Sequence, residues 1–395
     1  MLIPTGTRTE PRVRVAVNAW FLDRPGTGSG QYVRGLLRAM AQIAPETEFL
    51  AVVPSEELGD LAVPGLKLDL LACRIPRQRP GSNLGKVWFE QVLFRRACQR
   101  WGADLAHVPY WASPLWPAVP TVVTIHDVIP LMLPAYRGGP LVRLYTRLAA
   151  TSARQATLVL TDSLASKRDI EAQLGLPANR VRVVYLAHDG RFSREPADDD
   201  AAIRRQYGLP ERYVLYLAGH DVRKNVARLV EAFDIVAHAD DDVTLVIGGR
   251  LPDGDDPLFF DPRPLVASLG LADAVRLIGW VEEAHKPALY RGAACAVFAS
   301  RYEGFGLPVL EALACGTPLV TSTAASLPEL AGDAAFAVDP DDVKGMAGAI
   351  LACLVDEKLA ADLSWRGSVQ AARFSWTETA RETLAAYQEV MSCAS

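Results

Sequence analysis

The chain has 395 residues, of which 50% are hydrophobic and 22% are charged, so it can build the cores of two or three domains. No apolar run approaches the ~18 to 20 residues of a membrane span, and the N-terminus lacks the basic-then-apolar order of a signal peptide. The six cysteines are scattered without a CxxC pair, which indicates neither a disulfide framework nor a zinc site. These features predict a cytoplasmic protein with reduced thiols.

The net charge of -5 is unevenly distributed along the chain. Residues 1–190 contain 22 Lys and Arg against 15 Asp and Glu, whereas residues 191–395 contain 19 against 31. The basic first part is compatible with contact to an anionic ligand or surface. An uneven distribution that serves only solubility is the alternative.

Short β-rich runs alternate with helical patterns along the chain. Strands are expected in the first half at 12–19, 48–54, 104–108, 121–127, 157–163 and 181–187, with helical patterns at 29–42, 84–101, 141–155 and 163–174. Strands are expected in the second half at 213–219, 243–249, 275–280, 295–300, 317–322 and 335–340. This alternation predicts parallel sheets whose two faces are covered by crossover helices.

A polar, acidic stretch at 190–208 predicts a linker between two Rossmann-like, doubly wound α/β domains. We place the first domain at residues 1–195 and the second at 205–373. A cleft between two such domains is the expected ligand site, because ligands gather at the carboxyl ends of parallel strands.

The stretch "SRYEGFGLPVLEALACGTPLV" (300–320) joins a buried strand to a helix. Pro308 suits the first turn of that helix, and Gly316 suits its end. The loop that feeds the helix contains Gly304, Phe305, Gly306 and Leu307. Free amides at a helix N-terminus, approached through glycines, favour an anion such as a phosphate.

Two carboxylates flank this loop, Glu303 before it and Glu311 one turn inside the helix. A carboxylate accepts hydrogen bonds and suits the vicinal hydroxyls of a sugar or ribose. Together with the amides of the loop, the pair is typical of a nucleotide-sugar site. A Glu–Arg pair combined with a helix cap is the alternative interpretation.

The stretch "LAGHDVRKNVARLVEAF" (217–233) repeats the pattern of a strand, a short loop and a helix. Arg223 and Lys224 stand just before the helix, where two cations can neutralise a diphosphate. A solvated pair of cations is the alternative.

Two motifs of the first half point to the same cleft. In "VVTIHDVIPLMLP" (122–134), His126 ends a buried strand at the expected cleft edge, where it has either a functional or a structural role. In "NAWFLDRPGTGSGQYVRGLL" (18–37), glycines follow the first strand with the spacing GxGxG. The dinucleotide fingerprint GxGxxG is therefore not met, which argues against an NAD(P)-linked oxidoreductase.

With these motifs the chain resembles the retaining GT-B-fold glycosyltransferases of family 4, whose Glu-x7-Glu signature matches Glu303 and Glu311. The resemblance extends over about residues 12–390 and is closest to bacterial transferases that build polysaccharides from GDP-mannose. It implies a GT-B-type fold, two Rossmann-like domains facing across a cleft, with a final helix within 374–395 that crosses back to the first domain.

The resemblance also implies roles for single residues. His126 would lie beside the donor sugar and, with Glu303, act in catalysis. Family members often carry an arginine where this chain has His220, so Arg223 would take over that contact. The donor-binding residues implied are Gly28, Arg223, Lys224, Gly304, Phe305, Gly306, Leu307 and Glu311.

The expected activity is transfer of a hexose, with mannose favoured, from a nucleotide-diphosphate sugar to a glycan or lipid-linked acceptor in polysaccharide biosynthesis. No cofactor is expected. A metal is not expected either, because the acidic runs at 198–200, 240–242 and 252–257 lie in a linker, at the wrong sheet edge and in an ordinary loop. Alternatives are a nucleotide-sugar epimerase of the same overall fold and a non-catalytic sugar-binding relative.

The segment 74–100 has seven cations and one acid, with Trp88, Phe89 and Phe94 in a helical pattern. This composition is compatible with a peripheral contact to the inner face of a membrane. The alternative places the aromatic rings in the core and the arginines in water. Nucleic acid is not expected as a partner, because no recognition motif is present and the pI is about 5.8.

Overall fold

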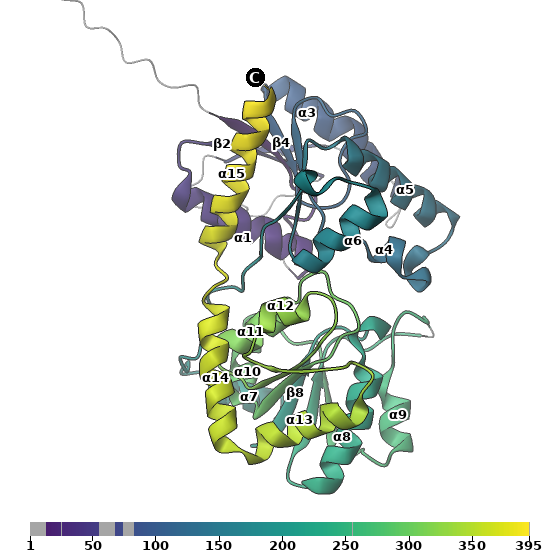
Figure 1. The fold of residues 1–395 in the computed structure, drawn as a ribbon, viewed down its shortest axis with the longest axis vertical. Helices are drawn as coiled ribbons and strands as arrows, with labels where there is room; N and C mark the ends of the chain where they lie inside the picture. The colour runs from purple at the N-terminus through teal and green to yellow at the C-terminus, as the bar shows by residue number, and fades with distance from the viewer. Residues whose placement is uncertain (1–12, 25, 55–67, 74–82, 255, 395) are drawn as a thin grey trace, which may run out of the picture.

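The computed structural model describes residues 13–24, 26–54, 68–73, 83–254 and 256–394. These residues form two halves stacked along the long axis of the molecule, each built on its own parallel sheet (Figure 1). Both sheets have the doubly wound strand order, in which the chain reverses direction next to the first strand of the sheet. The expected fold class, two Rossmann-like α/β units of GT-B type, is confirmed.

The N-terminal sheet has seven strands in the order β3-β2-β1-β4-β5-β6-β7, all parallel. Their bounds are β1 Arg14–Asn18, β2 Glu48–Val53, β3 Leu68–Ala72, β4 Leu105–Val108, β5 Thr121–Thr124, β6 Leu158–Thr161 and β7 Val181–Val183. Every described residue of β4, β5 and β6 is buried. Strands covered on both faces must be apolar throughout, which is the pattern that the sequence shows.

Helices cover the two faces of this sheet. One face packs against α1 (Gly28–Ile43) and the C-terminal helix α15 (Trp376–Ala394). The other face packs against the helical segment 83–101 and against α5 and α6. The bounds on that side are α2 Asn83–Trp88, the π-helix η1 Phe89–Leu93, α3 Phe94–Trp101, α4 Ile129–Met132, α5 Pro140–Gln155 and α6 Leu164–Leu174.

The C-terminal sheet has six parallel strands in the order β10-β9-β8-β11-β12-β13. Their bounds are β8 Tyr213–Leu217, β9 Thr244–Gly248, β10 Val275–Gly279, β11 Cys295–Phe298, β12 Leu319–Ser322 and β13 Phe336–Val338. The helices are α7 Asp200–Gln206, α8 Val226–Ala239, α9 Pro262–Ser268, α10 Lys286–Gly292, α11 Leu307–Ala314, α12 Leu327–Ala331, α13 Val343–Val355 and α14 Glu357–Ala371.

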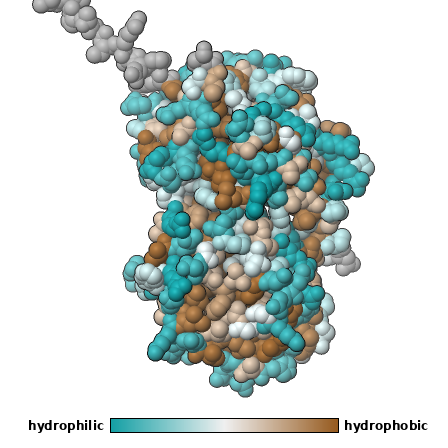
Figure 2. Space-filling model, viewed as in Figure 1, coloured by the Kyte–Doolittle hydropathy of each residue, from teal (hydrophilic) through white to brown (hydrophobic). Residues whose placement is uncertain are grey.

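The chain ends by crossing between the halves. Helix α14 packs on α11 of the C-terminal half, and α15 then runs along α1 of the N-terminal half (Figure 1). Trp376 at the start of α15 packs against Gly35 of α1, where an added Cβ would come within 2.4 Å of the indole. On the face drawn in Figure 2, hydrophilic and apolar residues are interspersed over both halves. No helix in the described part of the chain is long and apolar enough to cross a membrane.

Three expectations from the sequence need correction or completion. Strand β3 was not expected, because Asp69 interrupts its apolar run LDLLA. The acidic stretch at 190–208, expected to be a linker and the entry to the second domain, includes α7, which packs on α10, and its buried Asp200 forms an ion pair with Arg291. Of the aromatic residues singled out in segment 74–100, Phe89 and Phe94 are buried in the core, as the alternative interpretation has it, and Trp88 is exposed.

Candidate functional site

The carboxyl ends of β8 and β11 lie side by side at the point where the strand order of the C-terminal sheet reverses. The loops that follow them are joined by a backbone hydrogen bond of 2.8 Å from the Arg301 amide to the Arg223 carbonyl. A cavity of about 600 Å³ opens beside these loops, lined by both halves of the molecule. This is the place in a doubly wound fold where ligands bind.

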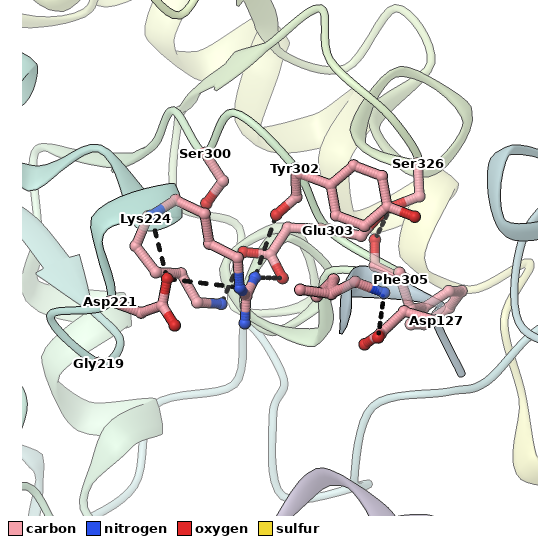
Figure 3. A network of polar contacts seen from close by, with 12 residues as sticks. Asp127, Gly219, Asp221, Lys224, Ser300, Tyr302, Glu303, Phe305 and Ser326 are labelled. Atoms are coloured by element: carbon pink, nitrogen blue, oxygen red, sulfur yellow. Dashed lines mark hydrogen bonds and ion pairs between the residues drawn. The ribbon is translucent and has the colours of Figure 1, made fainter. Parts of the chain in front are cut away.

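Glu303 is the centre of a buried ion-pair network beside the cavity (Figure 3). Its Oε2 atom lies 2.8 Å from Nη1 of Arg223, and its Oε1 atom lies 2.6 Å from Nζ of Lys224. Arg223 also donates to the Tyr302 carbonyl at 3.0 Å and lies beside the Asp221 carboxylate. Lys224 lies 4.9 Å from the centre of the Phe298 ring and lines the cavity.

The network fixes the charge of its members. Burial alone would raise the pKa of Glu303, but Lys224 and Arg223 outweigh burial and hold this pKa below its usual value. Burial lowers the pKa of Lys224, and the Glu303 carboxylate only partly offsets that effect. Arg223 and Lys224 share the Glu303 carboxylate, and Arg223 also lies 3.5 Å from Asp221, so the protein itself balances both cations.

The loop between the two acids joins the halves. An added Cβ at Gly304 would lie 2.4 Å from the His126 carbonyl, and Ser163 and Ser166 donate to the Gly304 carbonyl at 2.7 and 2.9 Å. Phe305 is buried among the rings of Tyr185 and Phe374.

Gly306 has φ 117°, a backbone conformation that favours glycine, and it precedes the first turn of α11. Gly304, Phe305 and Gly306 do not line the cavity in this structure. They shape the entry to α11, whereas Leu307, Pro308 and Glu311 on the helix itself face the cavity.

Glu311 is buried in α11, and its Oε2 atom lies 3.4 Å from the Tyr290 hydroxyl. Burial raises the pKa of its carboxyl to about 7, although Lys286 acts in the opposite direction. Glu283, which lines the same cavity and pairs with Lys286 at 2.5 Å, adds to the rise. This carboxyl is thus poised to ionise near neutral pH.

His126 follows β5 in the N-terminal half, and its Nδ1 atom lies 2.6 Å from the Asp162 carboxylate. Its Nε2 atom is buried without a hydrogen-bond partner, and its ring packs edge-on against Tyr32 at 5.0 Å. Burial would lower the pKa of His126, but Asp162 outweighs burial and raises it. The side chain lies outside the cavity lining, while its backbone contacts Gly304.

The N-terminal half contributes Gly26, Gly28 and Gln31 to the cavity lining. Gly28 begins α1, with Thr27 as the N-cap accepting from the Gly30 amide at 3.1 Å. An added Cβ at Gly28 would meet no atom within 4 Å, so space for a ligand exists here. The expected glycine loop therefore does face the cavity.

Sequence reasoning passed over several lining residues. His220 lines the cavity with both ring nitrogens buried and unpartnered, and burial lowers its pKa. Gln31, Arg250 and Trp280 also line it, as does the Glu283–Lys286 pair. The doubly wound pattern could have pointed to Arg250 and Trp280, because both follow strands of the same sheet. No sequence signal marked Gln31.

The described residues contain no cluster of three or more His, Cys, Asp or Glu side chains arranged to hold a metal ion. Asp253 and Asp256 of the acidic 252–257 stretch do line the cavity. The sequence predicted only an ordinary acidic loop here, and the structure adds that two of its carboxylates face the cavity. A second, smaller cavity of about 340 Å³ adjoins the first and shares Gln31 and Glu311 with it.

Both halves of the chain match known protein families. Residues 27–187 match the family described as "Glycosyl transferase 4-like domain", and residues 199–368 match "Glycosyl transferases group 1". The O-antigen chain mannosyltransferase B of Escherichia coli is 33% identical over 269 residues, which cover 68% of this chain and 70% of that protein. The chain belongs to the GT-B glycosyltransferases of family 4.

Two further comparisons cover nearly the whole chain. The MMP alpha-(1->4)-mannosyltransferase of Mycolicibacterium hassiacum is 29% identical, covering 96% of this chain and 99% of that protein. The crystal structure of Anabaena HepE in complex with UDP and glucose superposes with a TM-score of 0.71 and 18% identity, covering 96% of this chain and all of the other. At that identity the structural likeness shows the glycosyltransferase fold alone.

Proposed function

We propose that this glycosyltransferase transfers a hexose, with mannose favoured, from a nucleotide-diphosphate sugar to a glycan or lipid-linked acceptor, with retention of configuration. The observation that carries this proposal is that Glu303 pairs with Arg223 and with Lys224, and that Lys224 lines the cavity into which Glu311 faces. Cations for a diphosphate and carboxylates for hydroxyls thus stand within one site.

The donor would lie with its nucleoside toward α11 and its diphosphate toward the 220–224 loop. Glu311 would accept hydrogen bonds from the ribose hydroxyls. Arg223 and Lys224 would hold the diphosphate, and Leu307 would contribute its free amide at the start of α11. In this arrangement Gly304, Phe305 and Gly306 support the helix terminus rather than touch the donor, and Gly28 leaves room for the sugar phosphate.

Transfer breaks the bond between the anomeric carbon and the diphosphate oxygen, whose electron pair leaves with the diphosphate. Arg223 and Lys224 would stabilise the negative charge that develops there. Glu303 would hold both cations in place and position a sugar hydroxyl. The acceptor hydroxyl would attack from the face that the diphosphate leaves, and its proton would pass to a leaving phosphate oxygen.

His126 lies where the N-terminal half meets this loop, through its backbone contact with Gly304. We propose that a modest closure of the halves brings its Nε2 atom to the donor sugar. The Asp162 carboxylate would keep a proton on Nδ1 or hold the ring as an imidazolium, and the ring would then share charge near the anomeric carbon.

The preference for mannose rests on the names of two relatives, an O-antigen chain mannosyltransferase and an α-(1→4)-mannosyltransferase. GDP-mannose is the proposed donor, and a polysaccharide chain is the proposed product. The cationic pair would neutralise the diphosphate without a metal ion, so we propose metal-independent transfer. We also propose that the transfer takes place at the inner face of a membrane.

A thermal-shift panel with GDP, UDP, dTDP and their common sugars tests the donor, using wild type and Glu311→Ala. A ligand that binds only the folded state raises the Tm with its occupancy. We expect GDP and GDP-mannose to stabilise wild type and to lose most of that effect in the variant. Equal shifts for all nucleotides, or none, would reject the proposed donor.

Incubation of the donor with and without an oligosaccharide acceptor then tests the reaction. Product that forms only with acceptor and keeps the anomeric configuration of the donor supports retaining transfer. Conversion of the donor alone into an isomer would indicate an epimerase, and binding without any turnover would indicate a sugar-binding relative. Activity that is lost in chelator and restored by Mg²⁺ or Mn²⁺ would overturn metal independence.

A further inference from the structure

The outer flank of the N-terminal half carries apolar side chains that the fold leaves uncovered. Helix α5 buries only small residues (Thr146, Ala149, Ala150, Ser152 and Ala153). Two of its leucines point outward instead, with Leu141 79% and Leu144 64% exposed. A helix that served only the core would show the opposite arrangement, with leucines inside and small residues at the surface.

Exposed apolar residues also occur on the segments beside α5. Leu84 and Trp88 on α2 are 73% and 45% exposed, and Trp116 in the loop after β4 is 76% exposed. Six of the fourteen exposed large hydrophobics in the described part of the chain therefore belong to these three segments: Leu84, Trp88, Trp116, Leu141, Val142 and Leu144. A concentration of this kind marks an interaction surface more often than chance exposure.

Hydrogen bonds hold the three segments together. The Tyr145 hydroxyl of α5 donates to the buried Glu90 carboxylate at 3.0 Å, and Lys86 of α2 lies 5.3 Å from the Tyr145 ring. Gln91 donates to the Ser113 carbonyl at 3.0 Å and accepts from the Leu115 amide at 2.8 Å. We call the surface formed by α2, α5 and residues 111–116 the flank face. Figure 1 shows α5 at the outer edge of the N-terminal half.

The charge around the flank face is almost entirely positive. Residues 83–101 and 129–155 contain eight Lys and Arg (Lys86, Arg95, Arg96, Arg100, Arg137, Arg143, Arg147 and Arg154). Their single acid is Glu90, which is fully buried and lies 3.7 Å from Lys86. Arg137, Arg143 and Arg147 are exposed beside the uncovered leucines. Exposed apolar and aromatic side chains among cations are the combination that an anionic bilayer surface attracts.

We propose that the flank face docks this protein on an anionic lipid bilayer, with Leu141, Leu144 and Trp116 entering the interface and Arg143 and Arg147 contacting lipid phosphates. The inference deepens the proposed function, since a lipid-linked acceptor would then be met at the surface where it resides. It differs from the expectation for residues 74–100, because Phe89 and Phe94 are buried and the main apolar contribution comes from α5.

Flotation of the full chain with vesicles tests the proposal. We expect binding to phosphatidylcholine–phosphatidylglycerol vesicles and none to phosphatidylcholine alone. Replacing Arg143→Gln and Arg147→Gln together should weaken binding about 30-fold, the equivalent of two cations at ~1 kcal/mol each. Leu141→Ser with Leu144→Ser should reduce binding by a similar or larger factor, because the interface loses its apolar anchors.

The matched control is Val355→Ser with Val369→Ser, two apolar residues of the C-terminal half that are 69% and 51% exposed. This control should bind vesicles as wild type does. Equal loss in the control, or no vesicle binding by wild type, would overturn the proposal. Flotation requires no sugar transfer, and the thermal-shift panel requires no lipid, so failure of the docking face and failure of the proposed function are distinguishable.

Discussion

Glu303 holds two buried cations in place, and its replacement should show how much the site depends on that charge. In Glu303→Gln, Lys224 loses its carboxylate partner and Arg223 keeps only Asp221, so we expect a loss of about 3–5 kcal/mol in folding free energy. A nucleoside diphosphate would supply the missing negative charge. It should therefore raise the Tm of Glu303→Gln by more than it raises that of wild type.

The same thermal scan with Glu357→Gln, an exposed glutamate at the start of α14, is the control and should leave the Tm nearly unchanged. Transfer activity of Glu303→Gln should fall at least 100-fold, because the cations and a sugar hydroxyl lose their shared partner. A variant that melted like wild type and gained nothing extra from the nucleotide would contradict the ion-pair account.

Glu311 should make donor binding depend on pH, because its pKa lies at about 7. A raised pKa means that the free site holds a proton below that pH, whereas ribose hydroxyls are accepted best by the ionised carboxylate. Affinity for an intact nucleotide sugar should therefore rise about tenfold between roughly pH 6 and pH 8 and level off above. Isothermal titration calorimetry across this range measures the effect.

Glu311→Gln separates this titration from every other group, since the amide keeps the shape of the side chain without a proton to lose. Its affinity should be low and nearly independent of pH. A pH step that survives in this variant would assign the titration elsewhere, with His220 as a candidate in the cavity lining.

The sequence allowed the positions of some residues of the site to be predicted, but not of others. The two acids and the basic pair could be placed because each follows a strand whose carboxyl end faces the cleft. Phe305 could not, since its position in the chain is next to the site while its ring turns into the aromatic cluster with Tyr185 and Phe374. His220 was noted only as a departure from the family, although its ring lines the cavity.

Among the elements, the alternation of apolar runs predicted twelve of the described strands, because parallel strands buried on both faces have few polar residues. It missed β3, whose apolar run is interrupted by Asp69. The helical pattern at 84–101 was expected, but not the π-helix within it. That irregular turn, Phe89–Leu93, includes the buried Glu90 that meets Tyr145 of α5, and such tertiary pairing leaves no periodic trace in the sequence.

The loop between β11 and α11 is the element through which one half touches the other, and Gly304 sets the distance of that contact. An alanine Cβ would stand 2.4 Å from the His126 carbonyl and 2.9 Å from Asp127 Cβ, so the halves must separate slightly. Gly304→Ala should therefore leave nucleotide binding within about twofold but lower kcat/KM by 10-fold or more. Binding calorimetry and transfer assays measure the two effects separately.

Gly348→Ala is the matched control, since this glycine lies within α13 and an added Cβ meets no atom within 4 Å. It should raise stability by about 0.5–1 kcal/mol through helix propensity and leave activity unchanged. If Gly304→Ala weakened nucleotide binding as much as it lowered kcat/KM, the loop would act on the donor site itself rather than on the approach of the halves.

The two halves meet through contacts of two kinds. Near the cleft several of them are polar: Tyr302 donates to Asp169 at 2.7 Å, and Glu329 of α12 accepts from the Leu164 and Ala165 amides at the start of α6. At the far edge α15 lies along α1, with Trp376 packed on Gly35. The apolar packing of α15 on α1 is expected to persist, whereas polar contacts that solvent can reach break more readily. The two halves would therefore rotate about a pivot at the residues that join α14 to α15.

Substitutions of residues that do not line the cavity should alter how far the two halves open about this pivot. Tyr302→Phe combined with Glu329→Gln removes the hydroxyl bond and weakens the cap on α6, at about 1 kcal/mol for each bond. The radius of gyration from small-angle X-ray scattering should increase, and kcat should fall while the Kd for the nucleotide changes little. Glu378→Gln, which breaks an ion pair within α15, should alter none of these values.

An unchanged radius of gyration with unchanged kcat would mean that the halves do not need these bonds to stay closed, and that α15 alone sets their arrangement.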